Sequence, residues 1–112
     1  MFSLSKGRTC GVLWTYERFV DMELRGSSNV RDVLRDVSKT ECEDACLKAS
    51  GYACLAANYD HLLRECKLSD QNRFTRPEDF VSKQGVDYLE NQCEVGKAIK
   101  DFTTVFRLLV LL

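Results

Sequence analysis

One stretch decides the fold of this 112-residue chain: SKTECEDAC, residues Ser38–Cys46. Within it, Thr40 and Glu43 have the Ser/Thr-x-x-Glu spacing of a capping box, in which the Thr40 hydroxyl accepts from the Glu43 amide and the Glu43 carboxylate reaches back. The pattern predicts a helix from about Glu41 to Ala49, because Gly51 then supplies a stop signal.

Two cysteines lie on this predicted helix, four residues apart. Cys42 and Cys46 therefore project from one helix face and cannot bond to each other while the helix persists. Each must reach a different partner elsewhere in the chain.

The chain contains six cysteines, an even number in a short sequence: Cys10, Cys42, Cys46, Cys54, Cys66 and Cys93. This count is typical of a disulfide framework in an oxidising compartment, because a small core leaves little stability above the cost of ordering the chain. Six free thiols in a cytosolic protein are the less favoured interpretation. Six cysteines allow fifteen pairings, and spacing alone does not choose among them.

A zinc site is the main competing interpretation of the cysteines. Such a site needs ligands in close pairs, most often Cys-x-x-Cys or cysteine with histidine. The chain has no Cys-x-x-Cys, and His61 is its single histidine. We therefore expect neither a metal site nor a cofactor.

The composition indicates one folded domain. Lys and Arg number 16 and Asp and Glu 17, so the net charge is -1, and 45% of the residues are hydrophobic. The chain has enough apolar residues for a packed core, and its charges of both signs are interspersed. Because no overall positive field exists, neither nucleic acid nor an anionic membrane is indicated as a partner.

The two ends of the sequence bear on localisation. Met1–Arg8 lacks the apolar stretch that a signal peptide needs, so we expect a fragment, without its signal peptide, of a secreted protein or of a membrane protein's ectodomain. The apolar run Val105–Leu112 is too short to span a bilayer. It is consistent with a truncated membrane segment, a packed amphipathic helix or read-through beyond an exon, and the sequence does not separate these.

Segments with strand-like composition surround the predicted helix. Val12–Val20 is rich in aromatic and branched residues. The spacing of apolar residues in Val30–Val37 allows a short helix or an irregular strand, and we favour a loop followed by a short strand that ends near Val37. Ala53–Tyr59 and Glu65–Leu68 alternate in polarity and predict a hairpin, and Val86–Glu90 is expected to be the last strand. One helix against several short antiparallel strands is an α+β domain.

Several of these segments together resemble the PAN/apple domain family. The resemblance rests on Ser38–Cys46, Cys54, Asn58–Asp60 and Glu65–Asp70. The closing DYLENQC, Asp87–Cys93, resembles the Tyr-x-Glu-Asn-x-Cys ending of PAN domains in invertebrate matrix and zona-pellucida-type proteins. The matching segments span Cys10 to Cys93, which is most of the chain.

The resemblance implies a small disulfide-rich fold in which one helix packs on an antiparallel sheet. Carried over by order, it pairs Cys42 with Cys66, Cys46 with Cys54, and Cys10 with Cys93. It also implies a domain over residues 8–95, followed by a C-terminal extension over residues 96–112.

The same resemblance implies a non-catalytic extracellular module that recognises a protein or a carbohydrate. The alternative is a structural assembly module of an apical matrix or cuticle, with a matrix partner. The sequence contains no Gly-x-Ser-x-Gly, phosphate loop or His-Glu-x-x-His, and His61 has no obvious nucleophile beside it, so no catalytic residue is expected.

Candidate binding residues cluster in sequence around the predicted hairpin. Arg64, Lys67, Arg73 and Arg76 could offer a basic patch to a sulfated glycan or an acidic partner, although scattered charge more often only solvates a surface. Trp14 and Tyr16 could be exposed recognition aromatics, but beside Cys10 they are expected in the core.

Overall fold

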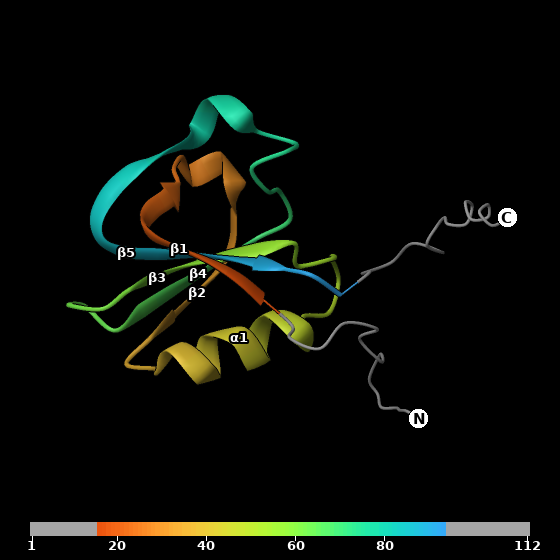
Figure 1. Cartoon of the computed structure of the whole chain (residues 1–112). Helices are drawn as coiled ribbons and strands as arrows, with labels where there is room; N and C mark the ends of the chain where they lie inside the picture. Colours follow the sequence, from red (N-terminus) through yellow and green to blue (C-terminus); the bar gives the residue numbers. More distant parts are fainter. Residues whose placement is uncertain (1–15, 94–112) are drawn as a thin grey trace, which may run out of the picture.

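In the computed structural model, the described residues 16–93 form a five-stranded antiparallel sheet with one α-helix against it (Figure 1). The strand order is β1-β5-β3-β4-β2. The α+β fold expected from the sequence is confirmed. The elements are β1 (Tyr16–Leu24), β2 (Val30–Arg35), α1 (Lys39–Leu47), β3 (Ala56–Asp60), β4 (Glu65–Ser69) and β5 (Phe80–Asn91), with short 3-10 turns at Ser27–Asn29 and Pro77–Asp79.

The strands follow the sequence pattern in the middle of the chain and depart from it at both sides. The β3–β4 hairpin and the short β2 strand are present as expected. Strand β1 runs on to Leu24 instead of ending at Val20, and β5 starts six residues earlier than Val86. The extra residues pair with each other beyond a bulge between Val20 and Met22. The sequence pattern did not predict these extra strand residues, because the early part of β5 is largely exposed and polar.

The helix begins two residues earlier than expected. Ser38, not Thr40, is the N-cap: its hydroxyl accepts from the Glu41 amide (3.1 Å), and the Glu41 carboxylate accepts from the Ser38 amide (2.7 Å). The prediction for Thr40 and Glu43 was therefore wrong. Two overlapping Ser/Thr-x-x-Glu patterns exist here, and the sheet selects the earlier one, since the Val37 amide still donates to the Arg64 carbonyl at the end of the hairpin (3.1 Å).

The helix also ends earlier than expected, at Leu47 instead of Ala49. Gly51 lies beyond this end and adopts a left-handed φ of 88°. A residue with a Cβ would be strained there. The glycine therefore allows the turn that follows the helix and does not itself cap the helix.

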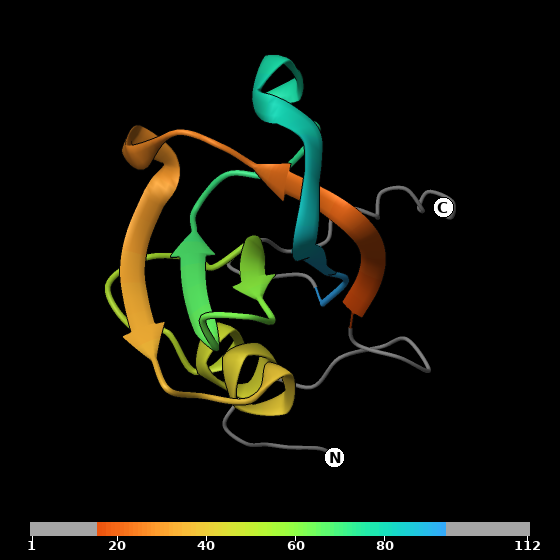
Figure 2. The ribbon, with the colours of Figure 1, turned by 90° about the vertical axis from the view of Figure 1, so that its left-hand side faces the viewer.

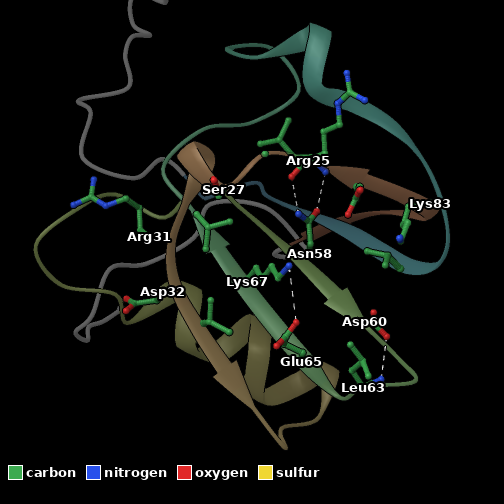
Figure 3. Close-up of a pocket in the computed structure, with 16 residues that line it drawn as sticks. Arg25, Ser27, Arg31, Asp32, Asn58, Asp60, Leu63, Glu65, Lys67 and Lys83 are labelled. Atoms are coloured by element: carbon green, nitrogen blue, oxygen red, sulfur yellow. Dashed lines mark hydrogen bonds and ion pairs between the residues drawn. The ribbon is translucent and has the colours of Figure 1, made fainter.

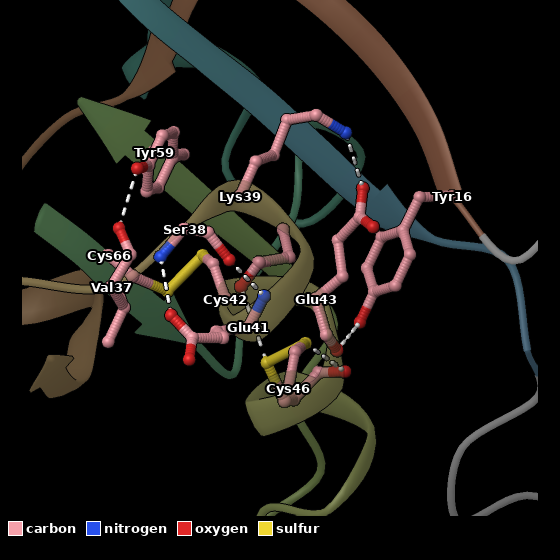
Figure 4. Close-up of a disulfide and its surroundings, with 12 residues drawn as sticks. Tyr16, Val37, Ser38, Lys39, Glu41, Cys42, Glu43, Cys46, Tyr59 and Cys66 are labelled. Atoms are coloured by element: carbon pink, nitrogen blue, oxygen red, sulfur yellow. Dashed lines mark hydrogen bonds and ion pairs between the residues drawn. A yellow bond between two sulfur atoms is a disulfide. The ribbon is translucent and has the colours of Figure 1, made fainter. Parts of the chain in front are cut away.

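Two disulfides pin α1 to the sheet (Figure 4). Cys42 is bonded to Cys66 on β4, and Cys46 is bonded to Cys54 just before β3. Both bonds join the cysteines that the resemblance paired, and all four side chains are buried. Cys10 and Trp14 lie outside the described residues, so the bond from Cys10 to Cys93 stays a prediction.

The face of the sheet under α1 is filled by side chains. The core there consists of the four bonded cysteines with Ala57, Tyr59, Leu68 and Leu89. Tyr16 is half-buried against this cluster, and its hydroxyl donates to the Glu43 carbonyl (2.8 Å). The Tyr59 hydroxyl donates to the Val37 carbonyl (Figure 4). This face therefore consists largely of groups that are already packed or bonded.

The opposite face of the sheet is filled over one part only. Leu24, Ala56 and Tyr88 form a second core with Phe19, Met22 and Phe80. Figure 2 shows α1 on one side of the strands and the β1–β2 connection passing across the other side. The part of this face beside β2 and β4 is left as a cleft.

Candidate binding cleft

The cleft has a volume of about 740 Å³ and is lined by residues of all five strands (Figure 3). The β1–β2 connection contributes Arg25, Gly26 and Ser27, and β2 contributes Val30 to Val33. Strands β3, β4 and β5 supply the floor and the far wall. The antiparallel pairing that brings β2 beside β4 is what closes one side of it.

Asn58 lies at the floor of the cleft and is committed to the fold. Its side-chain oxygen accepts from the Leu24 amide (2.9 Å), and its side-chain nitrogen donates to the Leu24 carbonyl (2.8 Å). Figure 3 shows both bonds. Since Asn58 is buried, this carboxamide has little capacity left for a ligand.

Lys67 is the cation nearest the middle of the floor. Its ammonium is 4.0 Å from Glu65 Oε1, while Glu65 Oε2 is 3.1 Å from Arg35 Nε. The Lys67 side chain is 47% exposed. Glu65 is therefore held more closely by Arg35, and the ammonium of Lys67 is free to donate to a closer carboxylate.

Apolar side chains form the rim of the cleft at its hairpin end. Leu63 is 63% exposed and Val33 is 39% exposed. The turn that carries Leu63 is held in place, because Asp60 Oδ1 accepts from the amides of both Leu62 and Leu63 (3.0 Å each). The rim thus presents apolar surface on a fixed backbone.

The charges around the cleft balance. Four cations and four carboxylates line it: Arg25, Arg31, Lys67, Lys83, Glu23, Asp32, Asp60 and Glu65. Arg31 is bound to Asp70 (2.7 Å) and lies over the Tyr52 ring, and it points away from the floor in Figure 3. Among residues 16–93, the side chains of Lys83 and Glu23 take part in no hydrogen bond or ion pair.

The structure does not bring together the four basic residues that the sequence predicted as a patch, which are Arg64, Lys67, Arg73 and Arg76. Arg64 precedes β4, whereas Arg73 and Arg76 follow it, so they flank opposite ends of that strand. Lys67 alone lines the cleft. Arg64 lies 3.8 Å from Asp36, and Arg76 donates to the Thr75 carbonyl (3.2 Å).

Arg73 is a structural residue in this arrangement. Its Nε donates to both oxygens of the buried Glu90 (3.2 and 3.1 Å), and its guanidinium lies over the rings of Phe19 and Phe74. It therefore holds the loop after β4 against the second core.

His61 also has a bonded partner within the fold. Its Nε2 lies 2.9 Å from Asp87 Oδ2, which also accepts from Arg18 Nε. Burial would raise the pKa of Asp87, but these two partners hold it below its ordinary value. The cluster joins β1, β5 and the β3–β4 turn.

The described part of the chain shows no grouping of three His, Cys, Asp or Glu side chains that could hold a metal ion. Within residues 16–93, no helix is long and apolar enough to cross a membrane.

Sequence reasoning missed the cleft because its lining comes from segments spread between residues 23 and 86. The cluster of basic residues in the sequence points to Lys67, but no local pattern points to Val33, Leu63 or Lys83 as cleft residues. The signal that was available was the alternation along β3 and β4, which places Asn58 and Lys67 on the face away from α1.

Comparison with known proteins supports the fold assignment. No match was found among curated proteins. A sequence model of the PAN domain family matches residues 10–93, which is most of the chain. The match includes the helix, both disulfides and all five strands, and we conclude that the chain belongs to the PAN domain family.

Proposed function

We propose that this chain is an extracellular, non-catalytic recognition module that binds its partner in the cleft beside β2. PAN domains in general are non-catalytic modules that bind proteins or carbohydrates. The two buried disulfides fit an oxidising, extracellular location.

The observation that carries the proposal is the contrast between the two faces of the sheet. The face under α1 consists largely of packed or bonded groups, whereas the cleft offers the weakly held Lys67 and the exposed rim residues Val33 and Leu63. Binding sites are usually concave, and this one places exposed apolar side chains on the same face of the sheet as an available cation.

The absence of catalysis is part of the proposal and follows from how the reactive groups are used. The one imidazole is held by Asp87 at the hairpin turn. The cleft lining contains no histidine and no cysteine. Of its carboxylates, Glu65 is paired with Arg35, Asp60 accepts from two backbone amides and Asp32 accepts from the Tyr52 hydroxyl.

Amide mapping by NMR tests the location of the site. The oxidised, 15N-labelled full chain is titrated with a panel of short peptides and oligosaccharides. We expect the largest amide shifts at Val33, Leu63 and Lys67. Shifts confined to the exposed side of α1, around Glu41 and Lys48, would contradict the proposal.

A role in matrix assembly is the second candidate, and one observation favours it. Leu62 in the β3–β4 turn is 89% exposed, and Phe74 in the loop after β4 is 70% exposed. These two apolar side chains flank opposite ends of β4, which would suit contacts with two neighbours in a polymer. Sedimentation at increasing protein concentration tests this role, because a chain that stays monomeric in the millimolar range does not assemble by itself.

A further inference from the structure

We propose that the partner held in the cleft is a protein chain and not a carbohydrate, an inference that rests on the proposed function. The partner would place an apolar side chain against Val33 and Leu63 and a carboxylate against Lys67.

The first reason is that the cleft contains no aromatic ring. None of its sixteen lining residues is Phe, Tyr, Trp or His. Sugar rings present flat arrays of C–H groups, and the face of an aromatic ring, with its negative charge density, is the surface that suits them. The aromatic rings on this side of the sheet, Phe19, Phe80 and Tyr88, are packed against one another outside the lining.

The second reason is that the carboxamide suited to sugar hydroxyls, Asn58, is already used, and that Asp60 and Asp32 are partly used. Asn58 is the only carboxamide in the lining, and both of its polar atoms are bonded to Leu24. Asp60 Oδ1 accepts from two backbone amides, and Asp32 accepts from the Tyr52 hydroxyl (2.7 Å). A neutral sugar would gain no hydrogen bond from the Asn58 carboxamide to offset the hydration that it loses there.

The third reason excludes sulfated glycans. A polyanion needs a surface with an excess of positive charge, but the four cations of the lining are matched by four carboxylates. Arg31 is further neutralised by Asp70. A sulfated chain in the cleft would meet Glu23, Asp60 and Glu65 at close range.

The available groups suit a polypeptide. Val33 and Leu63 supply exposed apolar area, and the turn that carries Leu63 is fixed by Asp60. Burial of such area against an apolar side chain is favourable in proportion to the area removed from water. Lys67 lies beside this area and can exchange its 4.0 Å contact with Glu65 for a direct charge-assisted bond to a carboxylate of the partner.

The test compares peptides and sugars on the same protein. Linear peptides are selected against the oxidised full chain from a random phage-displayed library, and the selected peptides are synthesised. Neutral and sulfated oligosaccharides form the second panel. Binding is measured by calorimetry and located by amide shifts.

We expect the selected peptides to combine an apolar residue with Asp or Glu and to shift the amides of Val33, Leu63 and Lys67. Leu63→Ser and Lys67→Gln should each weaken binding by about tenfold, as expected for a central contact residue. Lys67→Arg should retain binding. Lys48→Gln, which removes an exposed lysine at the C-cap of α1, is the matched control and should leave binding unchanged.

The outcomes separate the two proposals. If oligosaccharides shift the cleft amides and no peptide does so, the partner is not a protein chain, and the cleft remains the proposed site. Peptides that bind with shifts away from the cleft would overturn the cleft itself. A selection that enriches no peptide would also overturn the inference.

Discussion

Asn58 takes the place of a neighbouring strand for Leu24. Its carboxamide bonds both the amide and the carbonyl of Leu24 (2.9 and 2.8 Å), across 34 positions of sequence. Both residues are buried, and the pair joins the end of β1 to the middle of β3. This side chain therefore closes the floor of the cleft where no backbone ladder reaches.

Asn58→Ala should lower the free energy of unfolding by about 2 to 3 kcal/mol, because it leaves a buried N–H and a buried C=O of Leu24 without partners. Urea unfolding of the oxidised protein measures the change. Gln84→Ala, at an exposed position of β5, serves as the control. A change in Asn58→Ala no larger than in this control would refute the structural role of the amide.

Ser38→Ala should cost about 1 kcal/mol of stability, since the hydroxyl of Ser38 accepts from the Glu41 amide at the first turn of α1. Thr40→Ala should change stability by less than about 0.5 kcal/mol, because Thr40 is an exposed residue within the helix. The two variants are compared in denaturant with the disulfides intact. The reverse order of effects would place the start of the helix at Thr40.

The two disulfides that hold α1 should contribute unequally to the free energy of unfolding. The Cys42–Cys66 bond spans a sequence separation of 24 and the Cys46–Cys54 bond a separation of 8. The chain-entropy model gives roughly 3.5 and 2.6 kcal/mol for loops of these sizes. Replacing each pair with alanines should therefore cost more for Cys42 and Cys66, as measured by thermal unfolding. Equal or reversed losses would show that strain or residual structure outweighs loop closure.

Asp87 should make the protein acid-sensitive. Its pKa in the folded chain lies below the ordinary value of 3.8 because His61 and Arg18 bond the carboxylate. Since the folded pKa is the lower one, the stabilisation is complete above the unfolded value and is lost as pH falls below about 4. In Asp87→Asn, stability should be lower at pH 7 and should fall less steeply below pH 4. A variant with the wild-type slope in acid would show that other carboxylates control it.

Local sequence patterns predicted the helix, the separate bonding of its two cysteines and the β3–β4 hairpin. Cys42 and Cys46 at helical spacing implied two different partners, and the alternation along residues 53–68 implied the hairpin that supplies one of them. These signals are readable because helix and hairpin depend on residues close together in the chain. The cap at Ser38 was not readable, because Thr40 satisfied the same pattern and only the contact between Val37 and Arg64 distinguishes them.

The sequence by itself determined the class of the protein. Its cysteines and its closing DYLENQC segment can be recognised without knowing which side chains share a surface. Only the tertiary structure decided which residues line the cleft. Lys67, Val33 and Leu63 meet at the cleft because β2 pairs with β4 and the β3–β4 turn is fixed by Asp60. Arg73 lies close to the same hairpin in sequence, but its side chain instead donates to Glu90. The physical reason is that pairing between distant strands sets which side chains share a face, and no local periodicity encodes which strands will be neighbours.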